Sequence, residues 1–298
     1  GVIFGDSEAY KSFLLIDIAG HIATGKPWRG NKVKQGTVVF IAGEGGNGLR
    51  TRIEAWFERH GERKRNLAVS TAPLELCDPS NAELLIADIK RFIGDKEVSL
   101  IVLDTLNTHF GNGDENNTKD ITAFLKAVKK LQFATGATVA IAHHCGHADK
   151  TRQRGNISLK NGADWEFRLE RSGDHTTLIN TKFKDDAKPA PLSWTLAIQP
   201  LKWATEDRKP INGAVLEPST TASTTASTRG LLTRPQRLTL EALDTEINRH
   251  SDDGFALIAD WRRAALEAGI TQSESRQGKH AAFQRAVDAL VDAGLVTQ

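Results

Sequence analysis

The feature that most constrains the fold is the run Gly5-Asp6-Ser7-Glu8-Ala9-Tyr10-Lys11-Ser12, near the start of the 298-residue chain. It lies between a short apolar run, Val2-Ile3-Phe4, and a strongly helical run, residues 13–23. This is the strand–loop–helix context of the phosphate-binding pattern G-x-x-x-x-G-K-[ST]. Backbone N–H groups at the helix N-terminus would face phosphates, Lys11 would add a positive charge, and the Ser12 hydroxyl would ligate Mg²⁺.

Tyr10 departs from this pattern, because it stands where the second glycine belongs. A side chain there is sterically tight if the backbone needs a positive φ. The motif therefore needs support from the rest of the chain.

Composition indicates an ordinary soluble globular protein, with 39% apolar and 26% charged residues. We see no membrane-spanning run and no signal peptide. Cys77 and Cys145 lie far apart with no CxxC spacing, so we expect a reduced, cytoplasmic setting. A net charge of +2 is too small to imply nucleic acid by itself. The chain opens without Met inside its first expected strand, so we expect further sequence upstream.

The clearest boundary is the polar, low-complexity run from Pro218 to Thr228, which cannot bury enough surface to offset its ordering entropy. It should be a flexible tether. We therefore expect a body at residues 1–205, a linker at 206–230 and a small helical domain at 231–298.

The body alternates short β-rich runs with helical periodicity, which predicts an α/β fold with a mostly parallel sheet. The expected strands are 1–4, 37–42, 67–70, 98–104 and 138–142, and the expected helices are 11–24, 48–60, 78–93 and 119–134. After His144, residues 165–170, 176–183 and 192–198 have strand character with hairpin-like turns, which predicts an antiparallel extension.

Polar residues stand at the strand ends, where open α/β sheets bind ligands. Asp104 closes one buried strand, Glu44 follows another after a glycine, and His143-His144 close a third. Asp104 fits a carboxylate that acts on Mg²⁺ together with Ser12. Glu44 fits the group that orients or deprotonates an attacking water. Either histidine could sense a γ-phosphate and relay its loss to the following loop.

Each of these residues also has a structural interpretation, as a turn former, a helix cap or a core histidine. Their combination with a phosphate loop favours a site. A zinc cluster at His143-His144-Cys145-Gly146-His147 is the rival interpretation. Its spacing is too tight for a tetrahedral site from one segment, and no second ligand pair accompanies it.

The order of these features resembles the RecA/DnaB-type P-loop ATPase core, and more closely the RepA-like hexameric helicase branch of plasmids and phages. The resemblance covers roughly residues 1–200 and rests on residues 5–12, 36–45, 49–56, 100–106, 142–144, 154–156, 163–165 and 181–185. It implies a RecA-like core that binds ATP and Mg²⁺. The implied nucleotide-binding residues are Gly5, Asp6, Ser7, Glu8, Ala9, Tyr10, Lys11 and Ser12.

The resemblance also assigns roles in hydrolysis. It implies Lys11 at ATP, Asp104 as the Walker B acid, Glu44 as the catalytic glutamate and His143 as the sensor. It places ATP at a subunit interface, with a basic finger from the neighbouring subunit. Lys182 and Lys184 occupy the matching late strand. Lysine lacks the bidentate fork of arginine, so Arg168 and Arg171 are alternative fingers.

Residues 147–162 are basic and polar and lack strong periodicity, so alone they would indicate a solvated mobile loop. Their position after the sensor strand matches the pore loop of the family. A ring of such loops could track single-stranded DNA through phosphate contacts with little base specificity. The cations available for this are Lys150, Arg152, Arg154 and Lys160.

The tail has three expected helices, at residues 238–249, 257–268 and 278–293, which suit a winged-helix or related helix-turn-helix unit. Arg276, Lys279 and Arg285 would contact phosphates. Acids slightly outnumber bases in the tail, so protein contact is an equal alternative.

These observations predict an ATP-dependent DNA helicase motor of a plasmid, phage or integrated element. It would form a homo-oligomeric ring, expected to be a hexamer, and translocate on single-stranded DNA, with a replication initiator or primase as a further partner and no membrane. One alternative is a RecA-like DNA-binding ATPase without unwinding activity, as in recombination mediators. Another is a non-hydrolysing regulator, in which Tyr10 has spoiled the loop and the tail binds an operator.

Overall fold

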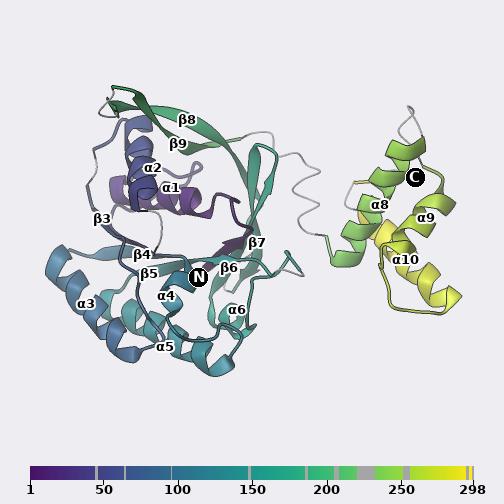
Figure 1. The fold of residues 1–298 in the computed structure, drawn as a ribbon, viewed down its shortest axis with the longest axis horizontal. Coiled ribbons are helices and arrows are strands. Elements are labelled where there is room, and N and C mark those ends of the chain that lie inside the picture. Colours follow the sequence, from purple (N-terminus) through teal and green to yellow (C-terminus); the bar gives the residue numbers. More distant parts are fainter. Residues whose placement is uncertain are drawn as a thin grey trace. The chain divides into compact units, whose positions relative to one another are not determined.

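The computed structural model describes residues 1–43, 46–63, 65–94, 96–146, 149–184, 187–204, 208–219, 232–250, 256–292 and 295–296. The chain divides into two compact units, Gly1–Thr220 and Thr221–Gln298 (Figure 1). Each unit has its own hydrophobic core.

A nine-stranded sheet forms the first unit, in the order β3-β2-β4-β5-β1-β6-β7-β8-β9. The strands are β1 Val2–Gly5, β2 Thr37–Ala42, β3 Leu67–Ser70, β4 Val98–Asp104, β5 Thr138–His144, β6 Trp165–Ser172, β7 His175–Phe183, β8 Leu192–Ala204 and β9 Pro210–Pro218. Strands β1 to β6 pair in parallel, and β6 to β9 pair antiparallel. The predicted parallel sheet with an antiparallel extension is thus confirmed.

Helices cover both faces of the parallel part. They are α1 Lys11–Thr24, α2 Gly46–Arg59, α3 Pro79–Ile93, α4 Leu106–Phe110, α5 Thr118–Thr135 and α6 Ser158–Gly162. In Figure 1, α1 and α2 lie on one side of the sheet and α3 to α6 on the other. Strand β2 is buried at every position, and its side chains alternate between the two cores: Val39 and Ile41 face one, Val38 and Phe40 the other.

Local signals fix where the helices begin and end. The Asp78 side chain accepts a hydrogen bond from the Ser80 backbone N–H at 2.9 Å, and Pro79 follows it at the start of α3. Asn117 caps α5 in the same way, through the Lys119 N–H at 2.8 Å. Helix α1 ends at Gly25, whose φ of 74° is left-handed and thus favours glycine.

Strands β2, β3 and β4 and helix α1 have the predicted bounds. The expected end of the body at residue 205 was wrong, because β9 at Pro210–Pro218 pairs with β8 inside the expected linker. Two short helices, α4 and α6, were not expected. Runs this short carry too little periodicity to be recognised in sequence. The rest of the expected tether, from residue 220 to 231, lies outside the described residues.

The second unit contains the three predicted helices, α8 Arg234–His250, α9 Ile258–Glu267 and α10 Arg276–Asp292. They pack around Trp261, Phe283 and Val287. The Trp261 indole N–H donates to the Thr239 carbonyl at 2.6 Å, which satisfies its buried polar group. Among the described residues of this unit there is no strand, so the wing of a winged helix has no counterpart in them.

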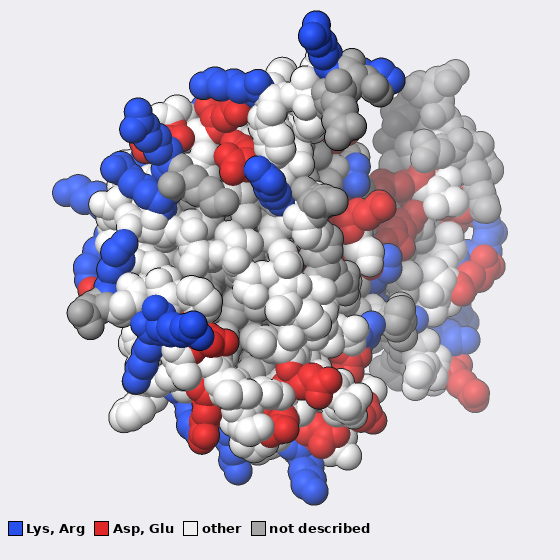
Figure 2. All heavy atoms as spheres, turned by 60° about the vertical axis from the view of Figure 1, so that its left-hand side comes forward, with Lys and Arg blue, Asp and Glu red and all other residues white. Residues whose placement is uncertain are grey.

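In the described part of the chain, no helix combines the length and the apolar character needed to cross a membrane. On the face drawn in Figure 2, basic and acidic side chains are interspersed around a largely uncharged middle.

A glycine pair tests the packing of α1 on α2. A Cβ atom at Gly20 would lie 2.5 Å from the Trp56 ring, whereas one at Gly48 on α2 would meet nothing within 4 Å. We expect Gly20→Ala to destabilise the first unit by about 1–2 kcal/mol, because overpacking outweighs the helix propensity of alanine. Gly48→Ala should be neutral or slightly stabilising. Urea unfolding followed by tryptophan fluorescence measures both, and equal effects would contradict this packing.

Candidate functional site

The loop between β1 and α1 is tightly packed and contains two left-handed residues. Strand β6 passes so close that a Cβ atom at Gly5 would lie 2.3 Å from the Leu169 carbonyl oxygen, so only glycine fits there. The backbone turns through left-handed conformations at Glu8 and Tyr10, with φ of 64° and 67°. The Thr176 hydroxyl donates to the Ala9 carbonyl at 3.0 Å and holds the loop against the sheet.

Tyr10 therefore occupies the left-handed conformation that makes glycine common at this position. Its ring has partners that offset the strain. The Arg171 guanidinium lies 4.5 Å from the ring centroid, and Phe13 packs edge-on at 5.7 Å. The loop thus has the backbone conformation that glycine would adopt at this position, although Tyr10 carries a side chain.

Lys11 points back into this loop. Its ammonium group donates to the carbonyls of Gly5, at 3.0 Å, and Asp6, at 2.7 Å. Burial lowers the pKa of Lys11, and the negative charge of Asp104 partly opposes that shift. Ser12 follows on the first turn of α1 and is half-buried.

The sheet brings the predicted strand-end residues to the same edge. Asp104, at the end of β4, pairs with Ala42 of β2, and the Gly43 N–H donates to the Asp104 carbonyl at 2.9 Å. His143 pairs with Phe4, the residue before Gly5. Glu44 lies outside the described residues, two positions after Ala42.

His109 is a supporting residue that sequence reasoning missed. It is fully buried on α4, where its Nε2 donates to the Ile41 carbonyl at 3.1 Å and its Nδ1 accepts from the Leu74 N–H at 3.2 Å. It thus fixes the end of β2 against the chain that follows β3. A lone histidine in an unrecognised five-residue helix gave no signal in the sequence.

His143 connects the strand ends to the following loop. Its Nε2 lies 2.9 Å from the Arg154 carbonyl oxygen and must donate, because a carbonyl only accepts. The loop folds back as a small hairpin, since the Arg154 N–H donates to the His144 carbonyl at 2.9 Å. Burial lowers the pKa of His143 to about 4. It is therefore neutral at neutral pH.

The same hairpin contacts the phosphate loop through Asp6. The Asp6 carboxylate accepts from the Cys145 thiol at 2.9 Å and forms an ion pair with Lys150 at 2.5 Å. The hydrogen bond from Cys145, and then that from Lys150, lower the pKa of Asp6. Burial and this same contact raise the pKa of Cys145 to about 11, so the thiol is protonated.

Two more of the expected DNA-binding cations are paired inside the chain. Arg154 forms an ion pair with Glu115 and donates to Asn107 at 3.2 Å. Lys160 lies on α6 and pairs at 2.7 Å with the buried Glu166, and its contact with DNA stays a prediction. Arg152 is exposed and pairs with no carboxylate among the described residues.

The lysines of the expected finger lie at the opposite edge of the sheet from this chain's own loop. Lys182 donates to the carbonyls of Lys160 and Ala163, at 2.7 and 2.6 Å, and so caps α6. Lys184 is 3.8 Å from Asp164. They do not contact the phosphate loop of their own subunit, and a role toward a neighbouring subunit stays a prediction. Arg171 is the alternative that does lie at the loop.

The residues of the alternative zinc cluster that the structure describes include two that make hydrogen bonds to other groups. His143 donates to Arg154, Cys145 donates to Asp6, and His147 lies outside the described residues. Among the described residues, Asp17 and His21 of α1 and His60, just after α2, form a group of ligating side chains close to one another.

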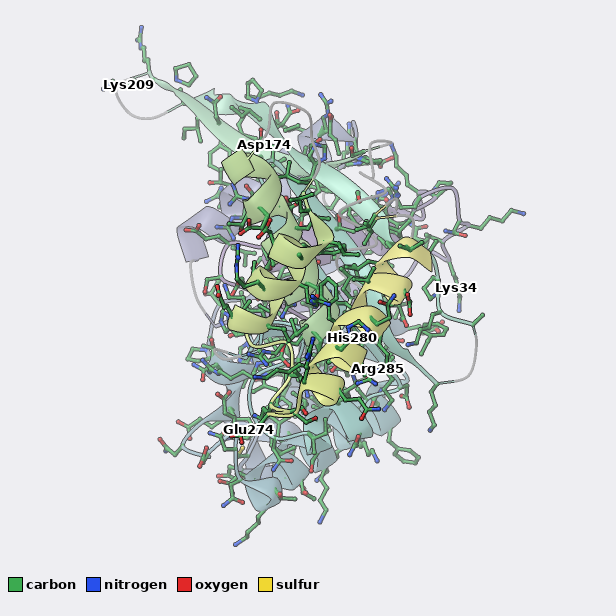
Figure 3. All side chains as sticks on the ribbon, turned by 90° about the vertical axis from the view of Figure 1, so that its right-hand side faces the viewer. Lys34, Asp174, Lys209, Glu274, His280 and Arg285 are labelled. Carbon is green, nitrogen blue, oxygen red and sulfur yellow. The ribbon has the colours of Figure 1, made fainter. Side chains whose placement is uncertain are left out.

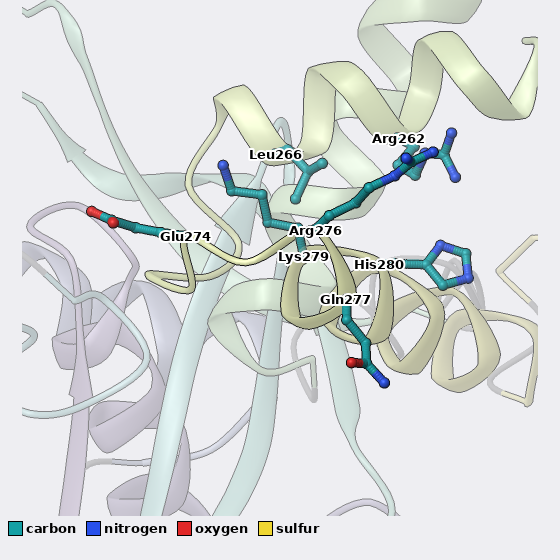
Figure 4. A pocket seen from close by; sticks show the side chains of 7 residues that line it. All are labelled: Arg262, Leu266, Glu274, Arg276, Gln277, Lys279 and His280. Atoms are coloured by element: carbon teal, nitrogen blue, oxygen red, sulfur yellow. The ribbon is translucent and has the colours of Figure 1, made fainter.

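The second unit has a basic pocket of its own, with a volume of about 750 Å³. Helices α9 and α10 and the loop before α10 form it (Figure 4); its lining is Arg262, Leu266, Glu274, Arg276, Gln277, Lys279 and His280. In Figure 3, His280 and Arg285 lie on α10 and Glu274 on the preceding loop. Two of the three predicted phosphate contacts, Arg276 and Lys279, thus share one concave surface.

The comparison with protein families covers the part of the chain that contains the loop between β1 and α1. Residues 1–150 match the sequence profile of a family described as "AAA domain". A crystal structure of the RadB recombinase is similar, with 12% identity and a TM-score of 0.47, over 65% of this chain and 85% of that chain. No curated protein matches the sequence.

The neutral state of His143 gives a pH prediction. Its folded-state pKa of about 4 lies below the ordinary 6.5, so the unfolded chain binds more protons between these values. The free energy of unfolding should therefore rise with pH across this window, by at most about 1.4 kcal/mol per pH unit from this group. His143→Gln keeps a donor for Arg154 but cannot titrate. Urea unfolding from pH 4 to 7 should give a flatter curve for the variant, and parallel curves would contradict the assignment.

Proposed function

The chain belongs to the AAA-domain family, and on that premise we propose that it is an ATP-hydrolysing motor of the RepA-like helicase type. It would bind ATP and Mg²⁺ at the phosphate loop and assemble as a ring, expected to be a hexamer. Hydrolysis would drive movement on single-stranded DNA during replication of a plasmid, phage or integrated element, with a replication initiator or primase as a further partner.

The observation that carries this proposal is the position of Lys11. A buried ammonium group sits on the loop carbonyls, with Asp104 and His143 at the same sheet edge. A cation and the backbone N–H groups of a helix N-terminus form a site for anions such as phosphates. Tyr10 adopts the left-handed conformation and its ring is packed, so the absence of the second glycine does not argue against a phosphate-binding loop.

Hard oxygen donors for Mg²⁺ are present at the same place. The Ser12 hydroxyl, on the first turn of α1, and the Asp104 carboxylate are oxygen ligands of the kind that Mg²⁺ prefers. Water and phosphate oxygens would complete the coordination of the ion. The ion would neutralise charge on the phosphates. We assign Glu44 to the orientation and deprotonation of the attacking water.

His143 suits the role of a sensor because it connects two regions. It lies on the strand beside β1 and donates to Arg154 in the hairpin that carries Arg152. Lys150 of the same hairpin pairs with Asp6 of the phosphate loop. A change in either loop would thus alter contacts of the other, which supports coupling between nucleotide and DNA.

A second candidate is a DNA-binding ATPase or regulator that reads DNA with its second unit. The observation that favours it is the basic pocket on α9 and α10, whereas three of the four expected loop cations already have carboxylate partners. DNA-stimulated ATPase without strand displacement would select the non-unwinding ATPase. Binding to a specific duplex without ATP turnover would select the regulator.

Lys11→Ala should reduce ATP turnover by at least about 100-fold, because it removes the cation inside the phosphate loop. Phosphate release measures this directly. The matched control is Lys34→Ala, an exposed lysine paired with Glu97, which should leave turnover unchanged. Near-normal hydrolysis by Lys11→Ala would overturn the phosphate-loop assignment.

Glu44→Gln should keep nucleotide binding and lower hydrolysis by about 10²–10⁴-fold, since the amide cannot accept the proton of water. Binding is followed with a fluorescent ATP analogue and turnover by phosphate release. If turnover falls less than about fivefold, Glu44 is not the base. In that case Asp104 and Glu54 are the carboxylates to test next.

Two charge variants locate the DNA contacts. If the hairpin binds single-stranded DNA, Lys150→Ala with Arg152→Ala should weaken binding, abolish stimulation of the ATPase and reduce the salt slope by roughly 0.7 per lost contact. Basal hydrolysis should remain. Arg276→Ala with Lys279→Ala should then have little effect. The reverse pattern would assign DNA binding to the second unit and remove the support for a pore loop.

A further inference from the structure

A cluster of three ligating side chains lies between α1 and the end of α2, away from the phosphate loop. Asp17 and His21 are one turn apart on α1, and His60 follows the last residue of α2. One ligand atom from each residue lies within 4.8 Å of the other two. We call this group the α1–α2 cluster.

Both imidazoles make a hydrogen bond to a backbone carbonyl through one ring nitrogen, as metal-bound histidines do. The His21 Nδ1 lies 3.2 Å from the Lys26 carbonyl oxygen, and the His60 Nδ1 lies 2.8 Å from the Trp56 carbonyl oxygen. Because a carbonyl only accepts, both Nδ1 atoms carry the proton, and each Nε2 keeps a lone pair. A histidine that donates its second N–H to a backbone carbonyl is the usual arrangement around a bound metal.

Asp17 completes the set as a buried carboxylate. It is 4% exposed, and its two oxygens accept from the indole N–H groups of Trp28, at 2.8 Å, and Trp56, at 2.9 Å. Two neutral donors orient this group without neutralising its charge. Its Oδ1 lies 3.5 Å from the His21 Nε2, a separation that suits two ligands of one ion with bonds of about 2.0–2.2 Å.

We propose that Asp17, His21 and His60 form a binding site for zinc or a similar divalent transition-metal ion. Two imidazole nitrogens and one carboxylate oxygen are a donor set that zinc accepts, with a water molecule in the fourth position. His21 also lines a surface cavity of about 410 Å³, which provides a path for the ion and its water.

The ion would add a bond between α1 and the chain after α2, beside the hydrogen bond from the Trp56 indole to Asp17. Helix α1 starts with Lys11 and Ser12, and the cluster lies toward its other end. A metal bridge to the chain after α2 would therefore stabilise the first unit without contact with the phosphates. The expected consequence is zinc-dependent stability in the absence of nucleotide.

The test uses the full chain, freed of affinity tag and treated with chelator. Competition with a chromophoric chelator should show tight zinc binding that His60→Gln weakens by at least about tenfold. His280→Gln, an exposed histidine on α10, and Cys145→Ser are the matched controls and should bind as the parent does. Trp28→Phe keeps all three ligands but removes one donor to Asp17, and should weaken binding less than His60→Gln. Zinc binding that is absent at micromolar concentration, or unchanged in His60→Gln, would overturn the proposal.

A second measurement does not depend on the folding of a variant. The Trp56 ring stacks on His60 with centroids 4.0 Å apart, so Co²⁺ in the site should quench tryptophan fluorescence, and zinc should reverse the quenching. Circular dichroism establishes that His60→Gln folds. If this variant does not fold, the parent protein alone gives the answer, because the absence of zinc-reversible quenching would reject the site. Quenching that persists in Ser12→Ala would show that the metal ion does not bind at the Mg²⁺ site.

Discussion

The parallel register of the central strands is the constraint on which the rest of the structure depends. Strands β4, β5 and β1 are neighbours, so Asp104, His143 and Gly5 reach the same edge of the sheet. Backbone hydrogen bonds and burial on both faces fix this register, because a shift by one residue would move every side chain to the opposite face. The core therefore brings the loop after β1, Asp104 and His143 to one edge of the sheet.

The antiparallel extension has a direct role in shaping the phosphate loop. Strand β6 approaches Gly5 too closely for any side chain, and Thr176 on β7 holds the Ala9 carbonyl. Arg171, at the end of β6, covers the Tyr10 ring. The left-handed backbone at Tyr10 costs of order 1 kcal/mol for a residue other than glycine. The loop keeps that conformation because its contacts with β6 and β7 hold its backbone in position.

Electrostatic contacts link the phosphate loop to the hairpin after β5. Lys150 and Asp6 are both largely exposed, so their ion pair contributes little to stability and can be exchanged for contacts with other ions. Lys160 differs, because its partner Glu166 is 1% exposed and would be left as a buried unpaired charge. Lys160 thus contributes to the fold, whereas Arg152 of the same segment is exposed.

The sequence determined the element order, most boundaries and the strand-end residues, because alternating burial, helix caps and a phosphate-loop pattern are local signals. It also predicted the three helices of the second unit. Only the tertiary structure showed which cations are already paired, that His109 braces the end of β2, that β9 extends the sheet, and that Asp17, His21 and His60 meet. These facts depend on contacts between residues distant in the chain. Pairing and proximity of that kind are set by how helices and strands pack, which no local pattern of residues encodes.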